Sequence, residues 1–171
     1  MRDQVLRIMR KFGLACLVLL CVVTGCNWVQ EVEVGDVQVS KLRMEMNTKS
    51  VLIELQAPVN NGSSRYLALT GVDGEIYTDE GVVARIALVD TCRVAAHTQE
   101  NLLVPVRVQL SDPLLLLKIG LNLSPETLDG FYVRGVADLQ VSRRENGSGY
   151  THQFTLEERP LVELANQMNL F

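Results

Sequence analysis

From about residue 37 onward, the chain alternates between apolar and polar residues with a period of two. This alternation predicts half-buried β-strands, because successive side chains of a strand point to opposite faces of the sheet. The apolar positions fall at Leu42, Met44 and Met46; Val51, Ile53, Leu55, Ala57 and Val59; Ala84, Ile86 and Leu88; Leu102, Val104, Val106, Val108 and Leu110; Phe131, Val133, Ala137, Leu139 and Val141; and Tyr150, His152, Phe154 and Leu156. Strands of this number and spacing predict a mainly β, antiparallel sandwich of about seven strands.

Turn signals separate the predicted strands. They are Asn60-Asn61-Gly62, Asp73-Gly74, Asp79-Glu80-Gly81 and the segment 146–149, Asn-Gly-Ser-Gly. Glycine and asparagine readily supply the positive φ of tight turns, so the last segment is expected to close a hairpin. Pro105 lacks an amide hydrogen, and we therefore expect it at a sheet edge or a bulge. Phase slips before Val37 and before Leu42 each predict a bulge or a break near the first strands.

Two segments depart from the alternation. Asp112 followed by Pro113 and an apolar run to Ile119 predicts a short crossover helix, with the aspartate as its cap and proline in its first turn. A loose hydrophobic crossover is the alternative. After Pro160, apolar residues at Leu161, Leu164, Ala165 and Met168 have helical spacing and predict a C-terminal amphipathic helix that packs on the domain.

The first 25 residues have the pattern of a secretory signal. Arg2, Arg7, Arg10 and Lys11 precede an apolar run that is too short to span a bilayer, which takes about 20 residues. The run ends in Val23-Thr24-Gly25-Cys26, a small pair directly before a cysteine, which is the pattern of a bacterial lipobox. The alternative is an ordinary signal peptide that happens to contain cysteines.

A lipobox predicts cleavage between Gly25 and Cys26 and acylation of Cys26. The expected organisation is a lipoprotein signal peptide at residues 1–25, a lipidated tether at 26–34 and a β-sandwich domain at 35–171. Two or more acyl chains give a stable anchor, so the expected partner is a membrane of the bacterial cell envelope. Asn27 in place of the aspartate that retains lipoproteins at the inner membrane favours the outer membrane.

Charge and cysteine content narrow the partners and cofactors. The net charge of −4 becomes more negative once the basic signal is removed, which argues against a nucleic-acid partner. Cys16 and Cys21 leave with the signal, so only Cys92 remains as a free thiol and no disulfide within the chain is expected. One thiol and two isolated histidines argue against a zinc site, and we expect no cofactor.

No constellation of residues indicates catalysis. His97 and His152 have no nucleophile or base beside them in the sequence, and both are interpreted as structural. Cys92 is expected to be a buried, inert thiol. Asp73, Glu75, Asp79 and Glu80 gather near two predicted turns and resemble a calcium site, but no calcium-binding loop motif is present, so no metal is expected. Arg143 and Arg144 beside the last turn are interpreted as a solvated hairpin tip rather than a phosphate site.

The order of these features resembles the late-embryogenesis-abundant type 2 domain, also called the water-stress/hypersensitive-response domain, which has lipobox-anchored bacterial versions. The resemblance covers about Gly35 to Leu156. It rests on a strand from Val51 to Val59 that runs into the Asn60-Asn61-Gly62 turn, a strand from Leu69 to Tyr77, the Leu102–Leu110 strand, a helical crossover, and a hairpin with Val133-Arg134-Gly135. The proline that family members carry between the asparagines is missing here.

The resemblance implies an immunoglobulin-like β-sandwich without catalysis, cofactor or metal. Three hypotheses of function remain open. The first is a non-catalytic, lipid-anchored domain that supports or protects the envelope under stress, or binds a partner protein there. The second is a module that binds an apolar ligand or lipid between the sheets or beside the leucine run 114–117. The third, an enzyme, has the least support.

Overall fold

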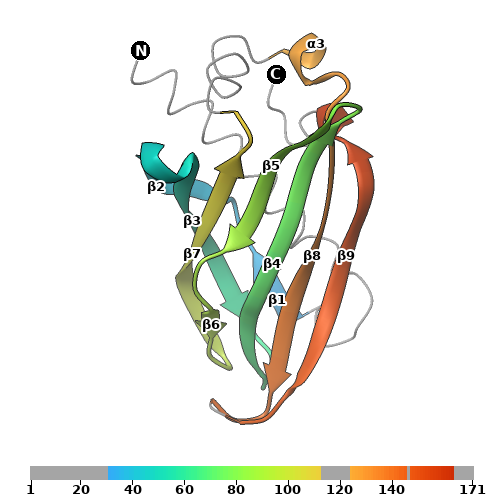
Figure 1. The fold of residues 1–171 in the computed structure, drawn as a ribbon. Helices are drawn as coiled ribbons and strands as arrows, with labels where there is room; N and C mark the ends of the chain where they lie inside the picture. Colours follow the sequence, from blue (N-terminus) through green and yellow to red (C-terminus); the bar gives the residue numbers. More distant parts are fainter. Residues whose placement is uncertain (1–30, 113–123, 146, 164–171) are drawn as a thin grey trace.

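The structure, a computed structural model, describes residues 31–112, 124–145 and 147–163. These residues form nine β-strands in one antiparallel sheet (Figure 1). The strands are β1 (Val32–Val34), β2 (Gln38–Glu45), β3 (Ser50–Asn61), β4 (Tyr66–Thr78), β5 (Gly81–Leu88), β6 (Cys92–Val94), β7 (Thr98–Leu110), β8 (Tyr132–Ser142) and β9 (Tyr150–Pro160). The six runs of alternating apolar residues correspond to β2, β3, β5, β7, β8 and β9.

The strand order across the sheet is β1-β3-β7-β5-β4-β8-β9. Strand β2 lies beside β1 on the same side of β3, and β6 continues the position of β5 beside β4. The nine strands thus occupy seven positions. Buried side chains from β3, β7, β4, β8 and β9 belong to one hydrophobic cluster, so the sheet curls around a single core. The protein is mainly β, with an antiparallel sheet that curls into a sandwich, as the sequence predicted.

The longest pairing in the sheet joins β3 to β7 and supplies much of the core. Ile53 lies opposite Val106 and Leu55 opposite Val104, and all four side chains are buried. Alternate residues of β7, such as Arg107 and Gln109, face outward and are exposed. Each side chain of this kind contributes roughly 1.5–3 kcal/mol when it is fully buried, so the period-two pattern alone stabilises this half of the sheet.

The N-terminal strands contain the irregularities that the phase slips predicted. β1 ends at Val34, and β2 begins at Gln38 after a break. The pairing of β2 with β3 then shifts register between Val39 and Lys41, which is a bulge at Ser40. β1 lies within the segment expected to act as a tether. Met46, expected on the face of β2, begins a 3-10 turn, Met46–Thr48.

Two predictions about turns and prolines were wrong. Asp73 and Gly74 lie inside β4, where they pair with β5 on one side and β8 on the other, and they form no turn. Pro105 lies inside β7, between β3 and β5, and not at a sheet edge. The Pro105 carbonyl accepts from the Val89 amide at 2.9 Å, so the Pro105 nitrogen points to the same side, where β5 has already ended. The missing amide hydrogen therefore leaves the sheet intact.

Of the three remaining turn predictions, two are confirmed. Gly81, with φ of 130°, follows the turn between β4 and β5. β8 and β9 form the expected hairpin, in which Val141 lies opposite Tyr150. The segment Asn60-Asn61-Gly62 ends β3 and leads toward β4, although Asn60 and Asn61 are still paired with β7.

Helical structure is limited among the described residues. The expected crossover helix at 113–119 lies outside them. A short helix that the sequence analysis did not predict, α3 (Pro125–Leu128), follows it, capped by Ser124. Residues 161–163 are helical, as the C-terminal pattern predicted, and the remainder of that predicted helix lies outside the described residues. None of the described helices is long and apolar enough to cross a bilayer.

Candidate functional site

The sequence-predicted site residues Gly25 and Cys26 lie outside the described residues, as does the leucine run 114–117. The lipidation of Cys26 therefore stays a prediction. Among the described residues, charged and aromatic side chains gather on the outer face of β5, β4, β8 and β9. We call this group the outer-face cluster, and it consists of Glu75, Tyr77, Arg85, Tyr132, Arg134 and Glu158.

Glu75 is the centre of the outer-face cluster. Arg134 lies directly opposite Glu75 on β8, and its Nη2 and Nε atoms donate to the Glu75 Oε2 atom at 2.9 and 3.3 Å. Arg85 lies opposite Glu75 on β5, with its Nε atom 3.4 Å from Glu75 Oε1. The antiparallel register thus places one carboxylate between two guanidinium groups, the cross-strand arrangement in which opposite charges attract.

Two tyrosines extend the cluster along the same pair of strands, β4 and β8. Tyr77 and Tyr132 lie opposite each other with stacked rings, 5.9 Å between centroids. The guanidinium carbon of Arg134 lies 5.0 Å from the Tyr77 ring centroid, within the range of a cation–π contact. The Tyr77 hydroxyl donates to Glu158 Oε2 on β9. The cluster therefore connects four neighbouring strands across the outer face.

These contacts shift the ionisation of the groups involved. The hydrogen bonds from Arg134, helped by the charges of Arg134 and Arg85, lower the pKa of Glu75 below its usual value. Partial removal from water and the hydrogen bond to Glu158 raise the pKa of Tyr77. Arg134 has a raised pKa because it donates to Glu75. Each shift favours the ionisation state that the group already has at neutral pH.

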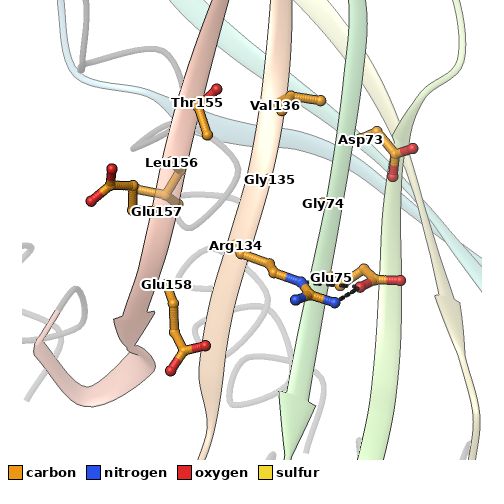
Figure 2. A pocket seen from close by; sticks show the side chains of 10 residues that line it. All are labelled: Asp73, Gly74, Glu75, Arg134, Gly135, Val136, Thr155, Leu156, Glu157 and Glu158. Atoms are coloured by element: carbon orange, nitrogen blue, oxygen red, sulfur yellow. Dashed lines mark hydrogen bonds and ion pairs between the residues drawn. The ribbon is translucent and has the colours of Figure 1, made fainter.

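A shallow hollow of about 520 Å³ lies beside the cluster, open to solvent on the outer face (Figure 2). Its wall includes Arg134 and Glu75 on one side and Glu157 and Glu158 on the other, and the backbone of Gly135 lies between them. Figure 2 shows Glu157 and Glu158 on β9 apart from the Arg134–Glu75 ion pair. Four of the ten residues that line the hollow are acidic, and Arg134 is the basic residue among them.

A second hollow of about 540 Å³ lies farther along the same face, between β6 and the end of the β8–β9 hairpin. Ala68 lies on its lining, and Arg93, Glu100 and Glu145 contribute charged groups. Both hollows are open depressions of the sheet surface, a shape that suits contact with a larger partner more than enclosure of a small molecule.

The acidic residues that resembled a calcium site are dispersed. Asp73 and Glu75 lie on the outer face of β4, and the carboxylate of Glu75 is engaged by two arginines. Asp79 and Glu80 form the turn before β5. Among the described residues, no three histidine, cysteine or acidic side chains are grouped so that they could hold a metal ion.

His97, His152 and Cys92 lie in three different environments. His97 is exposed in the turn before β7, with a left-handed φ of 53°. His152 lies on β9 between the rings of Tyr150 and Phe154, in edge-to-face contact with both. Cys92 is buried, and its thiol contacts the Asp90 and Leu103 carbonyls. Burial raises the Cys92 pKa to about 11, which makes the thiol unreactive at neutral pH.

Sequence analysis missed one buried polar centre. Asn61, fully buried, donates from Nδ2 to the Arg65 and Ala95 carbonyls at 2.8 Å each, and its Oδ1 accepts from the Ser63 amide and hydroxyl. Local sequence marked Asn61 as a turn former. Its role as a side-chain tie among three segments depends on Ala95, which is far away in the chain.

Comparison with known proteins adds nothing about function. The sequence matches no family model and no curated protein. Among solved structures, the fold is similar to a protein from Archaeoglobus fulgidus, with a TM-score of 0.43 and 13% identity over 74% of this chain and 94% of that one. It is also similar to the GAE domain of yeast GGA1, with a TM-score of 0.31 and 11% identity over 81% of this chain and 96% of that one. We draw no argument from similarities at this level.

Proposed function

We propose that the protein is a non-catalytic, lipid-anchored lipoprotein of the bacterial cell envelope, more specifically of the outer membrane. In this proposal, acyl chains on Cys26 hold a late-embryogenesis-abundant type 2-like sandwich at the bilayer. The sandwich either supports and protects the envelope under stress or binds an envelope protein. The lipobox supports the anchor, and the outer-face cluster is the observation that carries a binding role for the domain.

The cluster has the composition of a recognition surface. Tyrosine and arginine are the residues that contribute most often to the energy of protein interfaces, and here Tyr77, Tyr132 and Arg134 lie together on the outer face of β4 and β8. Their contacts to Glu75 and Glu158 hold them in fixed positions before any partner arrives. A preorganised surface loses less side-chain entropy on binding.

The same contacts make the cluster unsuited to proton transfer. A general acid or base works best when its pKa lies near the operating pH. The pKa of Glu75 is lowered and that of Tyr77 is raised, so both move away from neutrality. This observation supports a binding role over an enzymatic one for this face.

The anchor is tested by intact-mass spectrometry of the full chain purified from the membrane fraction of its host. We expect a chain that begins at an acylated Cys26. The Cys26→Ala variant should be released into the soluble fraction with its fold retained, as measured by circular dichroism. A chain cut elsewhere, or a Cys26→Ala variant that stays on membranes through carbonate washing, would contradict the anchor.

The binding role is tested separately by cross-linking in intact cells followed by identification of the attached proteins. Tyr132→Ala should reduce the amount of cross-linked partner several-fold. Arg107→Ala, an exposed arginine on the outer face of β7, is the matched control and should leave the partner unchanged. Equal loss in both variants would point to a general surface effect and would count against the cluster.

An apolar ligand is the second candidate function. It is favoured by the two strands at the ends of the sheet, where side chains that face the core remain half exposed, with Met44 on β2 48% exposed and Tyr150 on β9 49% exposed. Native mass spectrometry of the full chain in detergent should then show a lipid-sized adduct beyond the acyl groups. Met44→Lys should remove such an adduct, and its persistence would exclude a ligand at this place.

A further inference from the structure

Strand β9 lies at one edge of the sheet, and most of its length is regular, without a bulge. Among the described residues it pairs with β8 only, and from Tyr150 to Leu156 that pairing runs without a register shift (Figure 1). The irregularity comes beyond Leu156, where the register changes opposite Arg134. The backbone groups of β9 that point away from β8 can therefore accept a further strand.

The opposite edge of the sheet is protected in ways that β9 is not. There the chain breaks between β1 and β2, bulges at Ser40, and places Lys41 and Arg43 on β2. Breaks, bulges and edge lysines are the devices that prevent strands of different molecules from pairing. The segment Tyr150–Leu156 has no lysine, proline, glycine or bulge. The difference between the two edges indicates that β9 accepts a partner strand.

The side chains of this segment are symmetric about Gln153. An antiparallel pairing of two copies centred on Gln153 would place Tyr150 opposite Leu156 and His152 opposite Phe154 of the second copy. Thr151 would lie opposite Thr155, and the two Gln153 side chains would face each other. Aromatic, apolar and Thr–Thr pairs are those that stabilise antiparallel strands, and no two like charges lie opposite each other in this register.

The charges outside the segment fit the same register. Glu157 and Glu158 of one copy would extend past the end of the second copy's β9 and reach its hairpin tip. That tip carries Arg143 and Arg144 together with Glu145, all exposed, for a net positive charge. The acidic end of each β9 would thus approach the more basic end of the other, and the two acidic ends would stay apart.

Partly exposed aromatic side chains supply the apolar contact. Tyr150 is 49% exposed, and His152 and Phe154 beside it are partly exposed on the core-facing side of β9. The three rings already contact one another in edge-to-face pairs. A second copy would cover this row with its own.

From these observations we propose that the protein pairs with a second copy of itself through β9, antiparallel and centred on Gln153. The pairing joins the β8–β9 edges of two molecules into one continuous sheet. It does not depend on the lipid anchor, and it shares only Glu158 with the outer-face cluster. The partner strand is therefore identified by its chemistry as β9 of another molecule of this chain.

Cysteine cross-linking of the full chain in its host membranes tests the register directly. Gln153→Cys, Thr151→Cys and Thr155→Cys each place one thiol on the exposed outer side of β9. In the proposed register the two residues at 153 are adjacent, whereas two residues at 151, or two at 155, are about 14 Å apart. After oxidation, Gln153→Cys should form several-fold more disulfide-linked dimer than either threonine variant alone.

Mixing differently tagged Thr151→Cys and Thr155→Cys chains gives the complementary test. These positions lie opposite each other across the proposed pair, so the mixture should give a cross-linked dimer that contains both tags. The mixture also leaves the hydrogen bond from Gln153 to Asp138 intact, at 2.9 Å, and so reports even if Gln153→Cys fails to accumulate.

The unmutated chain and Ser40→Cys on the opposite edge are the controls, and neither should form a disulfide-linked dimer. Several results would overturn the proposal. One is the absence of dimer in both the Gln153→Cys variant and the mixture. Others are equal dimer yields at residues 151, 153 and 155, yields as high at Ser40→Cys, or cross-linking of Gln153→Cys to a different protein in place of a second copy.

Discussion

Pro58 and Pro105 occupy equivalent positions in the two longest paired strands of the first half of the sheet. Pro58 lies on β3 and accepts from the Gly35 amide at 2.8 Å, one residue beyond the end of β1. Pro105 lies on β7 and accepts from the Val89 amide at 2.9 Å, one residue beyond the end of β5. Each proline lies one position beyond the end of the strand that neighbours it, so its missing amide hydrogen breaks no ladder.

This equivalence predicts that the effect of a proline on stability depends on its position relative to the neighbouring strand, and not simply on its presence in a strand. Pro105→Ala should destabilise the fold by only about 0.4–1 kcal/mol, through the greater freedom of the unfolded chain. Arg107→Pro moves a proline two residues along β7, to a place where the strand pairs with Ala87. Loss of that buried hydrogen bond should cost about 1–3 kcal/mol or more.

The free energies of unfolding of both variants are measured by urea denaturation, with Arg107→Ala as the control for loss of the arginine side chain. A Pro105→Ala variant as unstable as Arg107→Pro would show that Pro105 is required for a reason other than its placement at the end of the β5 ladder.

Asn61 gives a second test of stability. Asn61→Ala leaves the Arg65 and Ala95 carbonyls without the donor that reaches them, in a fully buried place. We expect a loss of about 2 kcal/mol or more in the free energy of unfolding. The adjacent Asn60 is the matched control, because its side chain is exposed and donates a long hydrogen bond of 3.3 Å to Glu33. Asn60→Ala should change the free energy of unfolding by about 0.5 kcal/mol or less.

The sequence predicts this fold well because its signals are local and repeated. Alternation over β3, β7, β8 and β9 identifies each strand without knowledge of its partners, and the turn at Gly81 follows from local chemistry. The predictions failed where the conformation of a residue depends on the strands that pair with it. Asp73-Gly74 has the composition of a turn, yet both residues are held in β4 by strands on either side. Pro105 is compatible with an inner strand because β5 ends beside it.

The candidate site could be predicted only in part, for the same reason. Glu75 and Arg85 are close in sequence, but Arg134 joins them through the pairing of β4 with β8. No spacing along the chain reveals that register. Asn61 likewise looked like a turn residue until Ala95 was brought beside it. The lipidation of Cys26, in contrast, is a purely local pattern and needs no fold to be predicted.

Two residues in left-handed turns are expected to limit stability. Lys49 between β2 and β3 and His97 before β7 have φ of 51° and 53°. That conformation costs a residue with a Cβ about 1–2 kcal/mol, which glycine avoids, although glycine loses more entropy on folding. Lys49→Gly and His97→Gly should each stabilise the fold by up to about 1 kcal/mol in thermal or urea unfolding. Thr48→Gly, beside Lys49, should destabilise it.

Glu75 predicts a dependence of stability on acid. Its pKa is lowered in the folded protein from a usual value of 4.5, chiefly by the hydrogen bonds from Arg134. A lowered folded-state pKa gives stability that is present above 4.5 and is lost as the pH falls through the folded-state pKa. Glu75→Gln should therefore make the unfolding free energy less dependent on pH below 4.5. Glu54→Gln, an outward-facing glutamate bonded to Ser40, is the control.

Cys92 predicts the opposite end of the pH range. Its pKa rises from 9.0 to about 11 on folding, because burial disfavours the thiolate. A raised folded-state pKa gives stability that is complete below 9.0 and declines as the pH rises toward about 11, since the unfolded chain ionises first. Cys92→Ala should remove this part of the alkaline decline.

At neutral pH the Cys92 thiol of the folded protein should resist a maleimide reagent and react once denaturant unfolds the sandwich. Rapid labelling without denaturant would show that the β6 region opens far more easily than the contacts of Cys92 with the Asp90 and Leu103 carbonyls imply.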